Sequence, residues 1–154
     1  MSFEDDFKHL TANAPFPWQV SLYQDWLSLG KFPATCNLPT GLGKTSVVAI
    51  WRLALATNPA KVPRRLVYVV NRRTVVDQTT SEVERYRDAI QNNPELGQLR
   101  ETLASLCAVR SPGAAGVSSC PLALSTLRGQ FADNRKWSAD PALPASPRRW
   151  RNLA

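Results

Sequence analysis

Two glycines, a lysine and a threonine follow one another at a spacing suited to binding phosphate groups. They lie in the stretch 38–45, which reads L-P-T-G-L-G-K-T. Glycine lets the backbone bend so that successive N–H groups point into a concave site for an anion. A lysine can then reach the β- and γ-phosphates of a nucleotide, and a threonine hydroxyl can bind the magnesium ion that bridges them. The residues predicted to bind ATP and magnesium are Pro39, Thr40, Gly41, Leu42, Gly43, Lys44 and Thr45, with Thr45 as the metal ligand.

The elements on either side of this stretch favour a phosphate-binding loop over a glycine-rich turn with a solvated lysine. Leu38 stands where the common G-x-x-x-x-G-K-[ST] pattern has its first glycine, but the end of the pattern is intact. The apolar run 34–38 predicts a strand before the loop, and the apolar pattern 46–56 predicts a buried helix after it. The N-terminus of such a helix favours an anion.

A glutamine precedes the loop by about one helix. Trp18, Leu22, Trp26 and Leu29 recur at helical spacing, and the glycine that follows is a suitable helix end. Gln19 lies at the start of this pattern. Because an amide can pair with both N6 and N7 of adenine, we expect Gln19 to recognise the base of the nucleotide. The alternative is an exposed glutamine at a helix start.

A second candidate site follows the apolar run Leu66–Val70, which predicts a central parallel strand covered on both faces. Arg72, Arg73 and Thr74 come directly after it, at the start of another helical pattern. Ligands of α/β sheets bind outside the carboxyl ends of the strands, and a helix N-terminus beside arginines suits a backbone phosphate. These residues therefore predict a nucleic-acid contact. The alternative is a solvated arginine pair beside a strand.

A third turn of this kind follows a short strand candidate at 122–125. Thr126, Arg128 and Gly129 come at its end and are predicted to contact nucleic acid as well.

The net charge of +7 favours polyanions as partners, although three arginines of the last nine residues contribute to it. The widely spaced cysteines, Cys36, Cys107 and Cys120, indicate reduced, partly buried thiols in a cytosolic protein.

The chain has no leader-like or membrane-spanning run, so we expect a cytoplasmic protein without membrane contact. The 154 residues, 44% of them hydrophobic, suffice for one domain with a core. We expect a flexible N-terminus at 1–14, one domain at 15–145, and an unassigned tail at 146–154. The change of composition in the tail is compatible with an artificial end, a split gene or a frameshifted terminus.

Several segments together resemble the first RecA-like domain of the CRISPR-associated helicase-nuclease of type I systems, in particular the type I-U or I-G branch. They are F-P-W-Q (16–19), L-P-T-G-L-G-K-T-S (38–46), R-R-L-V-Y-V-V-N-R-R-T-V-V-D-Q (64–78) and S-T-L-R-G-Q-F-A-D-N-R-K-W (125–137). The resemblance implies an α/β fold: an incomplete RecA-like P-loop NTPase domain with a mainly parallel sheet flanked by helices. It also implies ATP and magnesium as ligands, single-stranded DNA as a partner, and a CRISPR surveillance complex as the partner of the full-length protein.

The same resemblance shows what the chain lacks. The family's acidic D-E-x-H box, its second RecA-like domain and its H-D nuclease pair are absent from the sequence. Magnesium-dependent hydrolysis needs such an acidic pair to hold the metal and position water. We therefore expect weak nucleotide binding at best, and neither useful ATP hydrolysis nor nuclease activity in this chain. Whether it acts as an enzyme is left open.

Three alternatives remain open at this point. A different superfamily 2 translocase, such as the motor subunit of a restriction enzyme, would carry the same loop. A small nucleotide kinase would also carry it, but would not explain the basic turn at 72–74. The third alternative is a non-catalytic remnant that binds nucleic acid without using nucleotide.

Overall fold

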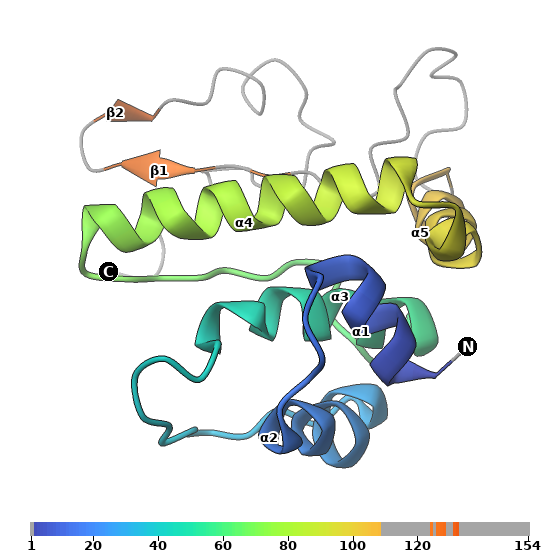
Figure 1. The fold of residues 1–154 in the computed structure, drawn as a ribbon, viewed down its shortest axis with the longest axis horizontal. Coiled ribbons are helices and arrows are strands. Elements are labelled where there is room, and N and C mark those ends of the chain that lie inside the picture. The colour runs from blue at the N-terminus through green and yellow to red at the C-terminus, as the bar shows by residue number, and fades with distance from the viewer. Residues whose placement is uncertain (1, 109–123, 125, 129–130, 133–154) are drawn as a thin grey trace.

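Helix α3 (Val47–Thr57) is packed between α1, α4 and α5 (Figure 1). The computed structural model describes residues 2–108, 124, 126–128 and 131–132. Residues 48–55 of α3 are all buried, in agreement with the apolar pattern that predicts a buried helix there. The indole N–H of Trp51 donates a hydrogen bond to the carbonyl of Pro63 at 2.8 Å. This bond ties the helix to the segment that leads toward α4.

Helix α1 (Phe3–Thr11) differs from the flexible N-terminus that the sequence predicts. The Ser2 hydroxyl accepts a hydrogen bond from the backbone N–H of Asp5, and three acidic residues occupy the first turn, where they favour a helix. Phe7 and Leu10 belong to the core, with 2% and 3% of their surface exposed. The helix is therefore held by a cap at its start and by burial of one face.

The segment 17–29, which lies between α1 and the phosphate loop, is helical, as its apolar spacing predicts. It consists of α2 (Pro17–Ser21), a π-helical turn η1 (Leu22–Trp26) and a 3₁₀ turn η2 (Leu27–Leu29). Gly30 ends it in the left-handed conformation, with φ of 73°. A Cβ atom on Gly30 would lie 2.5 Å from the Cβ of Lys61, so this glycine also permits a close approach of two segments.

Helices α4 (Arg73–Asn92) and α5 (Gly97–Ala108) follow, joined by the 3₁₀ turn η4 (Pro94–Leu96). The helical spacing of Val76, Thr79, Val83, Tyr86 and Ile90 predicts one buried stripe of α4. The last four are buried, and Val76 is half-buried. The Arg100 guanidinium donates to the Gln91 carbonyl at 2.7 Å and so caps the end of α4. The spacing of Leu96, Leu99, Leu103 and Leu106 predicts a further helical stripe, and these leucines lie in the core or pack against it.

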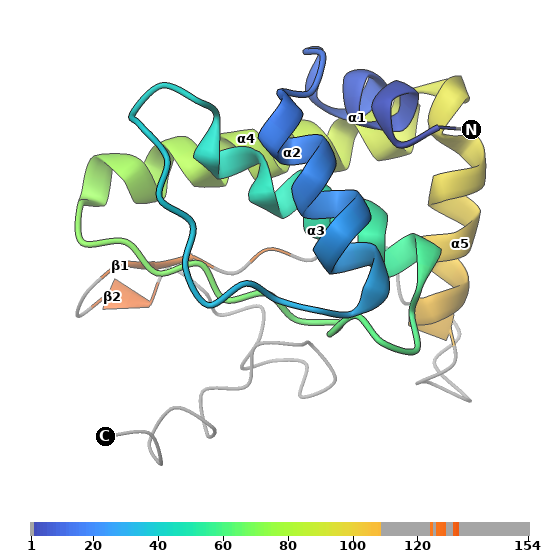
Figure 2. The same ribbon diagram turned by 90° about the horizontal axis from the view of Figure 1, so that it is seen from below.

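The described residues do not form the predicted parallel sheet. Their strands are β1 (Leu127–Arg128) and β2 (Phe131–Ala132), which pair antiparallel. The segment 66–71 is extended and runs along α4 (Figure 2), but no backbone hydrogen bond joins it to another described segment. Val69 is 80% exposed, where the sequence predicts a strand covered on both faces. The difference arises because no described strand lies beside this run. Residues 133–154, which include the predicted tail, lie outside the described residues.

The tyrosine in the buried stripe of α4 gives the fold a predicted dependence on alkaline pH. Burial, aided by Glu82, raises the pKa of Tyr86 above its ordinary value of 10. The unfolded chain therefore loses the Tyr86 proton at a lower pH than the folded chain. The contribution of Tyr86 to the free energy of unfolding is full below about pH 10 and declines as the pH rises above it. We expect Tyr86→Phe to make the alkaline fall in the free energy of unfolding shallower, as measured by urea titration between about pH 8 and about pH 11.

The exposed Tyr68 provides the matched control for this experiment. Tyr68→Phe removes an exposed hydroxyl and so reports how the exchange of tyrosine for phenylalanine itself affects the free energy of unfolding. A Tyr86→Phe curve parallel to that of the wild type would show that the proton of Tyr86 is not linked to folding.

Candidate nucleotide-binding cleft

The predicted phosphate loop leads directly into a helix, as its chemistry requires. The chain passes from the loop through the 3₁₀ turn η3 (Lys44–Ser46) into α3. Gly41 and Gly43 both adopt positive φ values, 90° and 65°. A residue with a side chain rarely adopts this conformation, so both predicted glycines are required by the backbone. The strand predicted before the loop is absent: residues 34–37 are exposed and irregular, and the thiol of Cys36 is free and exposed.

Two neighbouring side chains of α2, those of Trp18 and Gln19, donate hydrogen bonds to the loop and to the residue that follows it. The indole N–H of Trp18 donates to the carbonyl of Leu42 at 3.0 Å. The side-chain amide N–H of Gln19 donates to the Ser46 hydroxyl at 2.5 Å and to the Gly43 carbonyl at 3.3 Å. The same carbonyl accepts a hydrogen bond from the Ser46 hydroxyl at 2.6 Å. The backbone carbonyls of Leu42 and Gly43 are therefore turned toward α2.

Gln19 is nearly inaccessible in this arrangement. It is 2% exposed, and its side-chain oxygen accepts a hydrogen bond from the backbone N–H of Phe16 at 2.7 Å. Both ends of the amide are thus bonded to protein groups. Recognition of adenine by Gln19 stays a prediction, and it would require these hydrogen bonds to rearrange.

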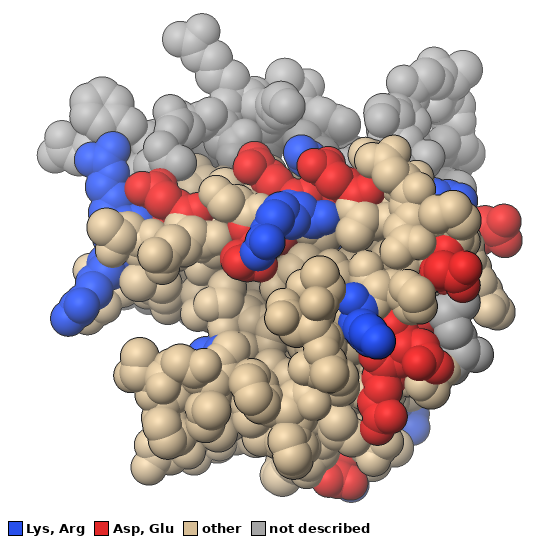
Figure 3. Space-filling model, viewed as in Figure 1, with Lys and Arg blue, Asp and Glu red and all other residues tan. Residues whose placement is uncertain are grey.

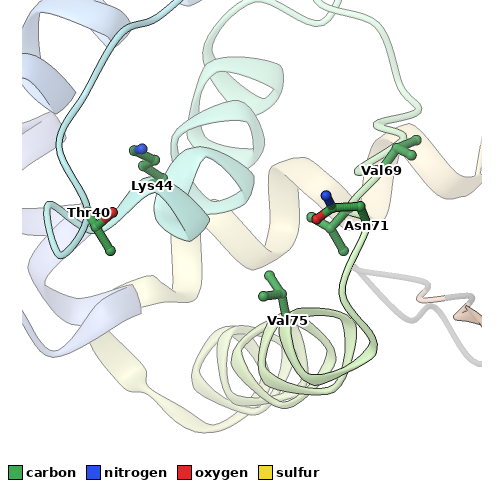
Figure 4. A pocket seen from close by; sticks show the side chains of 6 residues that line it. Thr40, Lys44, Val69, Asn71 and Val75 are labelled. Carbon is green, nitrogen blue, oxygen red and sulfur yellow. The ribbon is translucent and has the colours of Figure 1, made fainter.

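The loop opens onto a cleft of about 750 Å³. Figure 4 shows Thr40 and Lys44 on one side of this cleft and Val69, Asn71 and Val75 across from them. Lys44 is exposed, and Thr45 is half-buried at the start of η3. The cleft therefore brings the predicted phosphate loop opposite the end of segment 66–71 and the first turn of α4. Its size is that of a small-molecule site.

The predicted nucleic-acid contacts at 72–74 lie at the start of α4, beside this cleft. Arg72 is the residue before the helix, and Arg73 and Thr74 are its first two residues; all three are exposed. Figure 3 shows lysine or arginine side chains at the end of the molecule where α4 begins, next to a hollow below the helix. The N-terminus of α4 and two cations are thus presented together.

Of the third predicted nucleic-acid contact, formed by Thr126, Arg128 and Gly129, the structure describes the first two residues. The Thr126 hydroxyl lies 3.0 Å from the Thr80 hydroxyl of α4. Arg128 forms the end of β1, and Gly129 lies outside the described residues. The hydrogen bond brings the segment before β1 to α4, the helix that also carries the 72–74 turn.

Sequence reasoning missed Trp18, Ser46 and Asn71 as residues of this region. Trp18 was placed in an apolar helical stripe and in the segment F-P-W-Q, but not at the loop, since its contact with the loop spans 24 residues of sequence. Ser46 directly follows the loop, and Asn71 precedes the arginine pair, so nearness in sequence to a predicted site was the signal for both.

Among the described residues, no cluster of three or more His, Cys, Asp or Glu could hold a metal ion. None of the described helices is long and apolar enough to cross a membrane.

A comparison with known protein families identifies the family to which this region belongs. The family model described as Type III restriction enzyme, res subunit, matches residues 13–107, which is more than half of the chain. No curated protein and no solved structure matches the chain. The matched residues include the loop, the cleft and the start of α4. They indicate a RecA-like P-loop domain of a superfamily 2 helicase, which is part of an ATP-dependent nucleic-acid motor. The chain therefore belongs to the family of the type III restriction enzyme res subunit.

Proposed function

We propose that this chain binds ATP with magnesium in the cleft at the phosphate loop and holds single-stranded DNA at the start of α4. One observation carries the proposal: Lys44 of the loop and the first turn of α4 line the same cleft. A nucleotide held by the loop would therefore lie beside the groups proposed to grip the strand. Such proximity lets nucleotide occupancy alter the hold on DNA, as a motor requires.

The roles of the individual residues follow from their chemistry. Lys44 would neutralise the β- and γ-phosphates, and the Thr45 hydroxyl would contribute a ligand to magnesium. The backbone N–H groups of the loop would hold the remaining phosphate oxygens. Hydrolysis is not part of the proposal, since the sequence contains no D-E-x-H box to hold the metal and position water. Any ATP turnover that disappears in Lys44→Ala would contradict this part.

The proposed setting is DNA degradation in type I CRISPR interference, with residues 15–145 as the N-terminal RecA-like part of a helicase that acts with a nuclease. Support for this setting comes from the resemblance of segments 16–19, 38–46, 64–78 and 125–137. A restriction-enzyme motor is a second candidate, with which the family match is also compatible. Retention of the chain by a CRISPR surveillance complex assembled on target DNA would support the first. Retention only by the partner subunits of a restriction enzyme would support the second.

The proposed strand contact predicts a change in salt dependence. We expect Arg73→Ala to weaken binding of labelled single-stranded DNA and to reduce the slope of log K against log salt by about 1, because one phosphate contact is lost. Fluorescence anisotropy at several salt concentrations measures both quantities.

Arg85 offers the matched control on the same helix. It is exposed and already paired with Glu82. Arg85→Ala removes an equal charge away from the proposed contact and is expected to leave the slope unchanged. Equal slopes for the two variants would indicate that the strand does not contact Arg73.

A further inference from the structure

The hydrogen bonds between α2 and the phosphate loop determine which way two peptide units of the loop face. A trans peptide is planar, and its N–H points opposite to its C=O. The Leu42 carbonyl is bonded to Trp18, so the N–H of Gly43 points away from α2. The Gly43 carbonyl is bonded to Gln19 and Ser46, so the N–H of Lys44 also points away from α2. Two donors of the loop are thus directed to the side opposite α2.

Glycine at position 43 makes this arrangement possible. A Cβ atom there would lie 3.1 Å from the Gln19 side-chain nitrogen, which is closer than ordinary contact. The φ of 65° independently disfavours a side chain. The loop therefore approaches α2 closely enough for the Leu42 and Gly43 carbonyls to be bonded. Donors whose direction is fixed by such hydrogen bonds avoid the ordering cost that a mobile loop would pay on binding.

We propose that Trp18 is a positioning residue for nucleotide binding: its indole N–H holds the Leu42 carbonyl and so directs the Gly43 N–H toward the phosphates. Trp18 itself does not touch the ligand. The inference rests on the proposed function, since it assigns a task within the same site. This role differs from recognition of the base, because Trp18 would affect the binding of the phosphates whether or not an adenine is present.

The hydrogen bond can be tested without nucleotide. In an NMR spectrum of the free chain, the indole proton of Trp18 is expected to exchange with water more slowly than that of Trp26, which lies on an exposed side chain. Trp18→Phe is then expected to shift the amide resonance of Gly43, while Trp26→Phe leaves it in place. Equal exchange of the two indole protons would overturn the assigned hydrogen bond.

The positioning role is tested by two ligands, magnesium ATP and magnesium triphosphate without a base. Trp18→Phe is expected to weaken both by the same factor, about threefold to tenfold, since it removes one neutral hydrogen bond. Trp26→Phe is the matched control and is expected to change neither affinity. A melting temperature of Trp18→Phe close to that of the wild type excludes general unfolding as the cause of weaker binding. Phenylalanine keeps an aromatic ring at this partly buried position.

The outcomes separate the inference from the proposed function. If the wild type binds neither ligand, the proposed function fails, and the role of Trp18 fails with it. If the wild type binds both ligands and Trp18→Phe binds them equally well, the positioning role alone is overturned. A loss of affinity for ATP but not for triphosphate would also overturn it, because the effect would then lie at the base.

Discussion

Lys44→Ala is expected to lower the affinity for magnesium ATP by about 10-fold to 100-fold, because a hydrogen bond to a charged group contributes about 1.5–3 kcal/mol. Lys44 is exposed and lines the cleft, so its removal takes away a cation without leaving a buried gap. Since the proposed binding is weak, this loss is expected to abolish saturation in a titration with a fluorescent ATP analogue. It is the largest effect on ligand binding that the site predicts.

Lys8→Ala is the matched control for this substitution. Lys8 is an exposed lysine of α1 and does not line the cleft. The control removes the same charge, so any general electrostatic effect on nucleotide binding appears in both variants. Similar affinities of the two variants would mean that Lys44 makes no specific contact with the phosphates.

Phe7→Ala is expected to lower the free energy of unfolding by about 3–5 kcal/mol, because it empties a site in the core. Phe7 is 2% exposed and lies near the ring of Phe3, with 5.5 Å between the ring centroids. Domains of this kind are stable by only about 5–15 kcal/mol, so the variant is expected to be close to unfolded at moderate urea concentration. The midpoint of a urea titration measures the loss.

Phe32→Ala provides the control for a change of residue size. Phe32 is 50% exposed, and its truncation is expected to shift the midpoint only slightly. Equal shifts for the two variants would mean that α1 is not docked in solution, as the flexible N-terminus predicted from sequence would require.

The helices around the cleft could largely be predicted from the sequence, because their signals are local. The apolar run of α3 and the stripe of α4 repeat at helical spacing, and burial follows from that spacing. The two loop glycines were predicted for the same reason, since the need for positive φ is a property of the loop itself. Helix α1 was missed because its apolar residues stand among five charged or ionisable ones, which suggested a solvated segment.

The remaining features depend on contacts between distant parts of the chain, which a single sequence does not reveal. The run 66–70 has strand propensity, but pairing requires a neighbour that the described residues do not supply. Trp18 repeats at apolar helical spacing, yet its indole N–H bonds to a loop that lies 24 residues away. The amide of Gln19 was expected to be available to a base, and its bonds to Phe16 and Ser46 could be known only from the fold.

Titration of the isotope-labelled wild-type chain with magnesium ATP, followed by NMR, tests the central claim most directly. The account predicts that the amide resonances of Gly41, Gly43 and Lys44 shift saturably, accompanied by those of Asn71 and Val75 across the cleft. Shifts confined to other elements, such as α5, or no saturable shifts at all, would contradict nucleotide binding at this loop.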